Sequence, residues 1–287
     1  MISDLTDILQ LQAHLMARPE GAYRDRNGQP CRHPGGLYSQ SLGKVLSCMR
    51  KLTDTIQPDV QPDVRSKEGR PATMSALEAL FLAIDSHADD LKTILVSTTT
   101  LSSKKLARTC HLIDEIVEEL AGRPINRVKH HGEKLEACFC FNQQFAVYGY
   151  FIAGVRKDGV IAPSEHAHGS SGKQWSVAVT LRRLLGQLVQ VARVIQPHVR
   201  STLALPLPTW ADPHRSDLRS IAAWLQRCAP YCFPNEVNVL VPDVGLRGDE
   251  PYLRFDTLKR LRNALTQGVT WSRSFTADGV SRQFAVD

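Results

Sequence analysis

One apolar run constrains the fold more than any other feature of this sequence. Leucine, valine and isoleucine recur every three or four residues from Leu181 to Ile195. This spacing places them on one face of a long helix, and an apolar face of that length has to be covered by other elements. The opposite side carries Arg182, Arg183 and Arg193. We therefore expect a helix in the core of a mostly helical protein.

The same spacing recurs in other segments, at residues 3–17, 42–56, 77–95, 106–120 and 218–228. Ser75 and Glu78 form the pattern of a capping box, so the third of these helices should begin there. Gly122 follows the fourth helix and is typical of a helix end. We expect the third and fourth helices to pack as an antiparallel hairpin. Pro124 predicts a short additional helix that runs to residue 132.

Strand patterns appear in two places. Residues 136–141 and 145–155 are rich in aromatic and β-branched side chains, which predicts a central β-meander of two or three strands that ends near Pro163. Nearer the C-terminus the sequence predicts strands at 237–241 and 252–255, a helix at 258–267, and a hairpin at 269–286 around Asp278-Gly279. The fold class is therefore α+β, mostly helical, with a central β-meander and a C-terminal β-hairpin. Whether the two β segments join in one sheet is left open.

Proline-rich stretches divide the chain. Residues 57–64 repeat the tetrapeptide Gln-Pro-Asp-Val, and further prolines cluster at 206–213. Proline lacks an amide donor and disfavours helical geometry in the residue before it, so both stretches should be linkers. The expected segments are a helical 1–56, a linker 57–74, a unit 75–200 with helical hairpin, meander and long helix, a Pro-rich linker 201–215, and an α+β segment 216–287.

The charge distribution permits a polyanionic partner. The 287 residues hold 35 Lys+Arg against 29 Asp+Glu, which gives a net charge of +6. Residues 173–227 alone hold eight bases and two acids, with three tryptophans between them. Bases pair with phosphates and indoles stack on nucleobases, so this stretch predicts nucleic-acid contacts at Lys173, Arg182, Arg183 and Arg193. The alternative is that Trp224 is in the core and the arginines form a solvated helix face.

Residues 123–131 concentrate groups that bind anions. They hold three cations, two histidines and an asparagine at the expected start of a helix. Helix amides favour phosphate, arginine offers a planar fork, and histidine can move a proton near neutral pH. The candidate catalytic pair is Arg123 and His130, and the neighbouring candidate contacts are Arg127, Lys129 and His131. The alternative is an ordinary helix start with solvated side chains.

Arg123 and His130, with six residues between them, resemble the Arg-x4–6-His motif of the HEPN superfamily, helical proteins of bacterial conflict systems. Pro124 stands where that family usually has a polar residue. Residues 262–268 resemble the family's Arg-Asn-x3-His-Gly form, with Gln267 in place of the histidine. The resemblance implies metal-independent RNA cleavage, in which Arg123 holds the scissile phosphate and His130 transfers a proton. It also implies that two motifs pair across a homodimer.

We expect no metal and no cofactor, although the loop with Glu165, His166 and His168 leaves the question of a metal open. A closed zinc site needs four ligands, and the seven cysteines lack paired spacing, so reduced thiols are expected. The longest apolar run, 145–155, is shorter than the roughly 20 residues of a membrane helix. No secretory signal is visible, so we expect a soluble cytoplasmic protein without a membrane partner.

Two functions from different classes remain. The first is a HEPN-like protein linked to RNA or another nucleic acid. It would be a ribonuclease or its inactive relative, such as a toxin of an antiphage defence or conflict system. The alternative is a non-catalytic scaffold that packs on a protein partner. The sequence favours the first function and leaves catalysis, substrate and oligomeric state open.

Overall fold

A computed structural model describes residues 4–57, 69–118, 121, 124, 126, 133–141, 146–155, 161–164, 174–199, 213–228, 230–264 and 270–273. The helices are α1 (Thr6–Met16), α2 (Pro34–Thr55), α3 (Gly69–Thr98), α4 (Ser103–Val117), α7 (Val177–Val199) and α8 (Arg215–Arg227). The strands are β1 (Tyr23–Arg24), β2 (Pro30–Cys31), β3 (Lys134–Phe141), β4 (Ala146–Val155), β5 (Ile161–Pro163), β6 (Trp175–Ser176), β7 (Tyr231–Cys232), β8 (Leu240–Arg247), β9 (Glu250–Arg260), β10 (Arg262–Asn263) and β11 (Thr270–Arg273), and Pro234–Glu236 forms the short 3-10 helix η2. The fold is α+β and mostly helical, as predicted.

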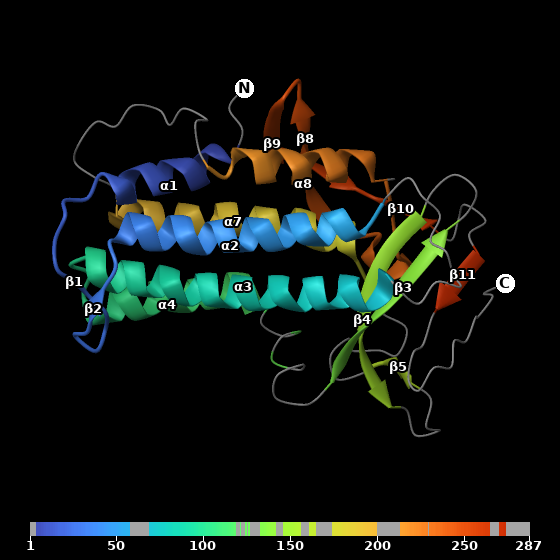
Figure 1. Cartoon of the computed structure of the whole chain (residues 1–287), viewed down its shortest axis with the longest axis horizontal. Helices are drawn as coiled ribbons and strands as arrows, with labels where there is room; N and C mark the ends of the chain where they lie inside the picture. The colour runs from blue at the N-terminus through green and yellow to red at the C-terminus, as the bar shows by residue number, and fades with distance from the viewer. Residues whose placement is uncertain are drawn as a thin grey trace.

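The helices form an elongated bundle with the main sheet at one end (Figure 1). Helix α7 contacts α1, α3 and α4 in the bundle, and β4 and β8 also pack against it. The predicted stripe from Leu181 to Ile195 is buried, because these neighbours cover most of the α7 surface. One hydrophobic core runs through the bundle and joins side chains from Leu5 to Leu253. Among the described helices, none is both long and apolar enough to cross a membrane.

Helices α3 and α4 form the predicted antiparallel hairpin, in which Lys92 of α3 lies 2.8 Å from Asp114 of α4. The start of α3 differs from the prediction, because the helix begins at Gly69 and the capping box at Ser75 lies inside it. Pro71 falls in the first turn, where an amide hydrogen has no helical partner in any case. Helix α3 therefore includes the last residues of the predicted 57–74 linker.

The central sheet follows the predicted meander. Strand β3 pairs antiparallel with β4 over its whole length, and β5 and β6 pair with β4. Strand β11 pairs antiparallel with β3, with Trp271 opposite Cys140. The C-terminal part of the chain therefore contributes a strand to the central sheet, which answers the question that the sequence left open.

A second, two-stranded sheet is the β-hairpin of β8 and β9, which turns at Gly248 with φ +60°. The predicted helix at 258–267 is wrong for its first part, because Leu258, Lys259 and Arg260 belong to β9. Lys259 and Arg260 pair with Val241 and Leu240, and this tertiary pairing overrides the local helical spacing. The hairpin predicted around Asp278-Gly279 lies outside the described residues.

Candidate nucleic-acid interface

Arg182 cannot act as the surface contact that the sequence predicted. Its side chain is only 7% exposed, and its guanidinium donates to the carbonyl oxygens of Leu225, at 2.7 Å, and Val244, at 3.2 Å. Burial lowers the pKa of the guanidinium. The reason is that β8 packs on the side of α7 that the periodicity assigned to solvent, and the end of α8 brings the carbonyl oxygen of Leu225 to the same side chain.

Three other described arginines of the 173–227 stretch form ion pairs within the protein. Arg193 forms ion pairs with Asp4, at 2.5 Å, and Asp7, at 2.6 Å. Arg219 lies 2.6 Å from Asp249, and Arg215 pairs with Glu250. Arg183 is half-buried, and its charge acts on the carboxyl group of Glu236. Acids from distant parts of the chain therefore neutralise much of the surface that looked basic in the sequence.

The remaining predicted site residues lie outside the described residues. These are Arg123, Arg127, Lys129, His130, His131 and Lys173, together with His166 and His168 of the loop considered for metal binding. The structure therefore neither brings them together nor separates them. Within the described residues, no three histidines, cysteines or acids lie close enough to hold a metal ion.

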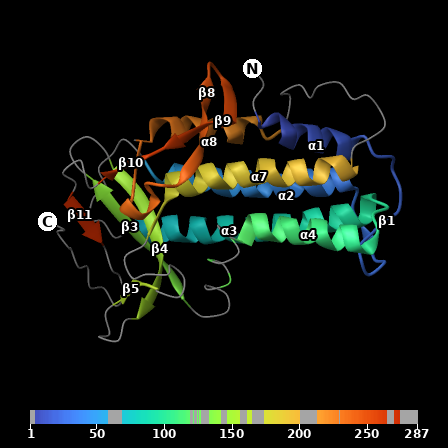
Figure 2. The same ribbon diagram turned by 180° about the vertical axis from the view of Figure 1, so that it is seen from behind.

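A basic surface that the sequence analysis missed lies at the end of the bundle opposite the main sheet (Figures 1 and 2). The β1–β2 ribbon and the start of α4 meet there, because β1 packs against α3, whose last turn leads directly into α4. We call this surface the basic end. Its exposed cations are Arg24, Arg26, Arg32, Lys104, Lys105 and Arg108.

The described part of the chain offers the cations of the basic end no acid partner. None of its six cations forms an ion pair with an acid among the residues that the structure describes. Arg24 donates instead to the carbonyl oxygen of Gly28, at 2.6 Å, and Arg32 to the side chain of Gln40. The nearby acids on the β1–β2 segment are Glu20 and Asp25. A carboxylate oxygen of Asp25 accepts the amides of Asn27 and Gln29, so it closes the turn of the ribbon.

The first turn of α4 adds to the positive potential. Lys104 and Lys105 occupy this turn, which holds no acidic residue, and the side chain of Ser102 does not cap it. Cations at a helix N-terminus oppose the helix dipole, at a cost of roughly 0.3–1 kcal/mol each. A sequence that breaks this rule on an exposed helix start concentrates positive charge there, which suits an anionic partner.

His33 anchors the ribbon to the bundle. Its ring accepts the amide hydrogen of Gly35, at 3.2 Å, and so caps the start of α2, while its other nitrogen lies 3.1 Å from the carbonyl oxygen of Arg18. The ring of Tyr23 packs edge-on against His33, with centroids 5.5 Å apart. The ribbon arginines therefore extend from a base that is fixed to α1 and α2.

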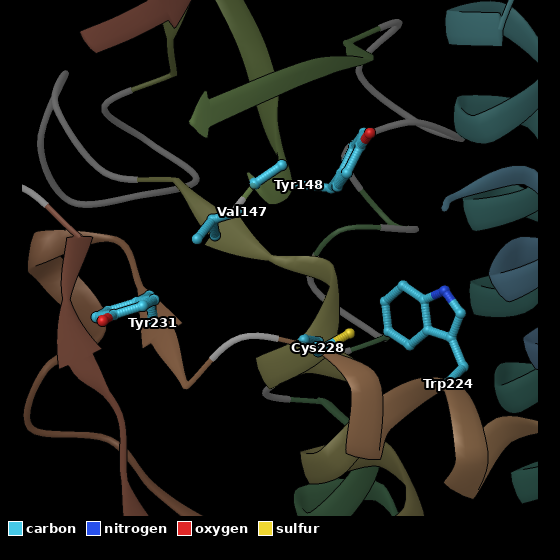
Figure 3. A pocket seen from close by; sticks show the side chains of 7 residues that line it. Val147, Tyr148, Trp224, Cys228 and Tyr231 are labelled. Atoms are coloured by element: carbon cyan, nitrogen blue, oxygen red, sulfur yellow. The ribbon is translucent and has the colours of Figure 1, made fainter. Parts of the chain in front are cut away.

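An apolar pocket is lined by residues of β4, β7, the start of α7 and the end of α8 (Figure 3). It has a volume of about 290 Å³, including space open to solvent, and its lining is Ala146, Val147, Tyr148, Ala178, Trp224, Cys228 and Tyr231. Trp224 is buried, as one of the sequence interpretations had it, and its indole donates to the carbonyl oxygen of Ile56 at 2.7 Å. Burial raises the pKa of Tyr148. The lining carries no charged group, so the pocket does not extend the basic end.

Comparison with protein-family models, with curated proteins and with solved structures gives no match to this chain.

Proposed function

We propose that this protein binds RNA through the basic end of its helical bundle. The observation that carries the proposal is the set of six exposed cations on the β1–β2 ribbon and α4, none of them paired with a described acid. A nucleic-acid backbone presents a row of phosphates, and each cation that contacts one releases counterions and adds affinity. Four of the six are arginines, whose planar fork matches phosphate geometry.

The resemblance of residues 123–130 to the HEPN motif extends this proposal to RNA cleavage. In that extension the basic end holds the RNA backbone, Arg123 binds the scissile phosphate, and His130 transfers a proton to or from the ribose hydroxyl. In the same extension, the protein would act in a bacterial conflict or defence system. Cleavage is tested separately from binding, because the two rest on different residues.

Binding is measured by fluorescence anisotropy with a 5′-labelled single-stranded RNA over a range of salt concentrations. Replacing three cations of the basic end should lower the affinity and make it less sensitive to salt. The logarithm of the association constant declines linearly with the logarithm of the salt concentration. The magnitude of this slope should decrease by about 2, since each phosphate contact on a single strand contributes roughly 0.7. The variant carries Lys104→Gln, Lys105→Gln and Arg108→Gln.

A matched variant removes three exposed cations elsewhere, through Lys44→Gln, Lys51→Gln and Arg247→Gln. It has the same net charge and should bind RNA like the unmodified protein. Equal losses of RNA affinity in both variants would mean that only the total charge matters. The basic end would then not be the binding site. No binding by the unmodified protein would reject the proposal and favour the scaffold alternative.

Cleavage is measured on the same RNA in the presence of a chelator, with His130→Ala as the test variant. A HEPN-like ribonuclease should lose cleavage in this variant and keep its RNA affinity. If the unmodified protein binds RNA without cleaving it, the binding proposal stands and the catalytic extension is rejected.

A further inference from the structure

A polar cluster lies where α1, α2 and the start of α8 meet. The hydroxyl oxygen of Ser39 on α2 lies 3.3 Å from Nε2 of His214, the residue that precedes α8. The side-chain amide of Gln12 on α1 donates to the same hydroxyl oxygen at 3.5 Å. When Ser39 accepts from Gln12, its own hydroxyl hydrogen is left to donate to the histidine nitrogen.

The imidazole of His214 is held in place by the surface of α2. The residue is only 7% exposed, and its ring lies against Gly43, one helical turn after Ser39. A Cβ atom at position 43 would come within 2.8 Å of Cε1 of the ring. Glycine inside a helix costs roughly 1 kcal/mol relative to alanine. Here it provides the space that lets the ring reach Ser39.

Two further observations mark the cluster as open to a ligand. Ser39 is half-buried, so part of this residue lies at the protein surface. The carbonyl oxygen of the Gln12 side chain is buried and accepts no hydrogen bond from the described residues. A buried acceptor without a donor is costly, and a ligand with an N–H or O–H group beside its reactive centre would satisfy it.

We propose that Ser39 and His214 form a nucleophile and general base for the hydrolysis of a small ester. A serine next to a histidine whose orientation is fixed is the arrangement that activates a hydroxyl group. Hydrogen bonds in such pairs are often long before substrate binds. This proposal uses neither the basic end nor the HEPN-like residues, so it stands apart from the proposed RNA function.

In the first half of the reaction, Ser39 Oγ forms a bond to the ester carbonyl carbon and its proton passes to Nε2 of His214. The bond to the leaving alkoxide breaks, and the alkoxide takes that proton from His214. In the second half, water attacks the acyl carbon and gives a proton to His214, the bond to Ser39 breaks, and Ser39 Oγ regains a proton from His214. The net reaction consumes one ester and one water and gives one acid and one alcohol.

The test is labelling of the purified protein with a fluorophosphonate probe, followed by peptide mapping, with hydrolysis of p-nitrophenyl acetate as a second readout. We expect the label on Ser39 and its loss in Ser39→Ala. Gly43→Ala keeps both reacting groups but displaces the ring, so it should slow labelling by about a hundredfold. Circular dichroism of each variant checks that the fold is kept.

Ser220→Ala is the matched control, because Ser220 is a half-buried helical serine, like Ser39, whose hydroxyl donates to the carbonyl oxygen of Ser216. It should be labelled like the unmodified protein. Labelling that persists in Ser39→Ala, or that is unchanged in a folded Gly43→Ala protein, overturns the proposal. Absence of any label on the unmodified protein also overturns it.

Discussion

The guanidinium of Arg182 lies 2.7 Å from the carbonyl oxygen of Leu225, inside the protein and at the C-terminal end of α8. A second carbonyl, that of Val244, accepts from the other amino group of the same side chain. Two backbone carbonyls therefore stabilise a buried positive charge, and they join α7 to α8 and β8.

Replacing Arg182 by lysine should destabilise the fold, because one ammonium group cannot reach both carbonyls with the geometry of the guanidinium fork. We expect a loss of about 1–3 kcal/mol in the free energy of unfolding, measured by urea denaturation. Arg247→Lys, at an exposed position on β8, is the control and should change the free energy by less than about 0.5 kcal/mol. Equal stability of the two variants would contradict the role of Arg182.

Glu236 should make the protein less stable as the pH rises towards neutrality. Burial raises the pKa of its carboxyl group to about 7, although Ser176 and Phe233 donate hydrogen bonds to it. The unfolded chain releases this proton near its ordinary pKa of 4.5, while the folded protein keeps it up to about pH 7. The stabilisation is complete below pH 4.5 and is lost by about pH 7, and it amounts to about 3 kcal/mol.

In Glu236→Gln the side chain has no carboxyl group and does not titrate, so this contribution to the pH dependence of stability is removed. Relative to the unmodified protein, the variant should gain free energy of unfolding as the pH rises from 5 to 8. Urea denaturation at four pH values measures this difference. A difference that stays constant with pH would contradict the assignment.

His87 should act in the opposite direction. It is buried, with its Nδ1 atom 2.7 Å from the hydroxyl oxygen of Ser41, and burial lowers its pKa to about 4. The unfolded chain takes up a proton below its ordinary pKa of 6.5, while the folded protein resists it down to about pH 4. Stability from this group is complete above pH 6.5 and is lost as the pH falls to about 4.

The pH ranges in which His87 and Glu236 change the free energy of unfolding overlap. Their opposite effects should largely cancel in the unmodified protein between about pH 4.5 and 6.5. The single variants should reveal the two slopes. His87→Gln should become less stable as the pH rises through this range, and Glu236→Gln more stable. Two variants with slopes of the same sign would falsify this account.

Gly149 on β4 should not tolerate a larger side chain. An added Cβ atom would collide with the ring of Phe233 and would lie 2.5 Å from the carbonyl oxygen of Trp175, which is backbone and cannot turn aside. We expect Gly149→Ala to destabilise the fold by about 1–3 kcal/mol. Thermal unfolding measures the effect.

Gly36 provides the matched comparison, because an added Cβ atom there has no neighbour within 4 Å and the residue lies in α2. Gly36→Ala should raise stability by about 0.4–1 kcal/mol. A gain in stability at both glycines would show that packing around Gly149 is looser than the structure has it.

Elements whose pattern shows in the local spacing of their residues were predictable. The apolar stripe of α7 and the alternating β3 and β4 strands follow from local spacing, and their partners confirm it. Pairing between distant segments was not predictable in the same way. Lys259 and Arg260 look helical in their local sequence, but Val241 and Leu240 offer them a strand.

Charge compensation shows the same limit for the candidate site. A short stretch of sequence around Arg193 does not contain its partner Asp4, and one around Arg219 does not contain its partner Asp249. The basic end was missed for the converse reason, since the two halves of its charge lie far apart in the sequence. One local signal was available, because Lys104 and Lys105 follow two serines at a helix start without any acid.

The contact of Asp4 with β9 has a consequence for synthesis on the ribosome. A carboxylate oxygen of Asp4 accepts the amide hydrogen of Phe255, which lies 251 positions later in the chain. At about 5–20 residues per second, the nascent chain needs roughly 13–50 s to supply that partner. During this interval the carboxylate of Asp4, just before α1, lacks both the amide of Phe255 and, for most of the time, Arg193 of α7. A chain whose translation stops before β9 could therefore still pack α1 on α2 and α7, but Asp4, just before α1, would lack its hydrogen bond to Phe255.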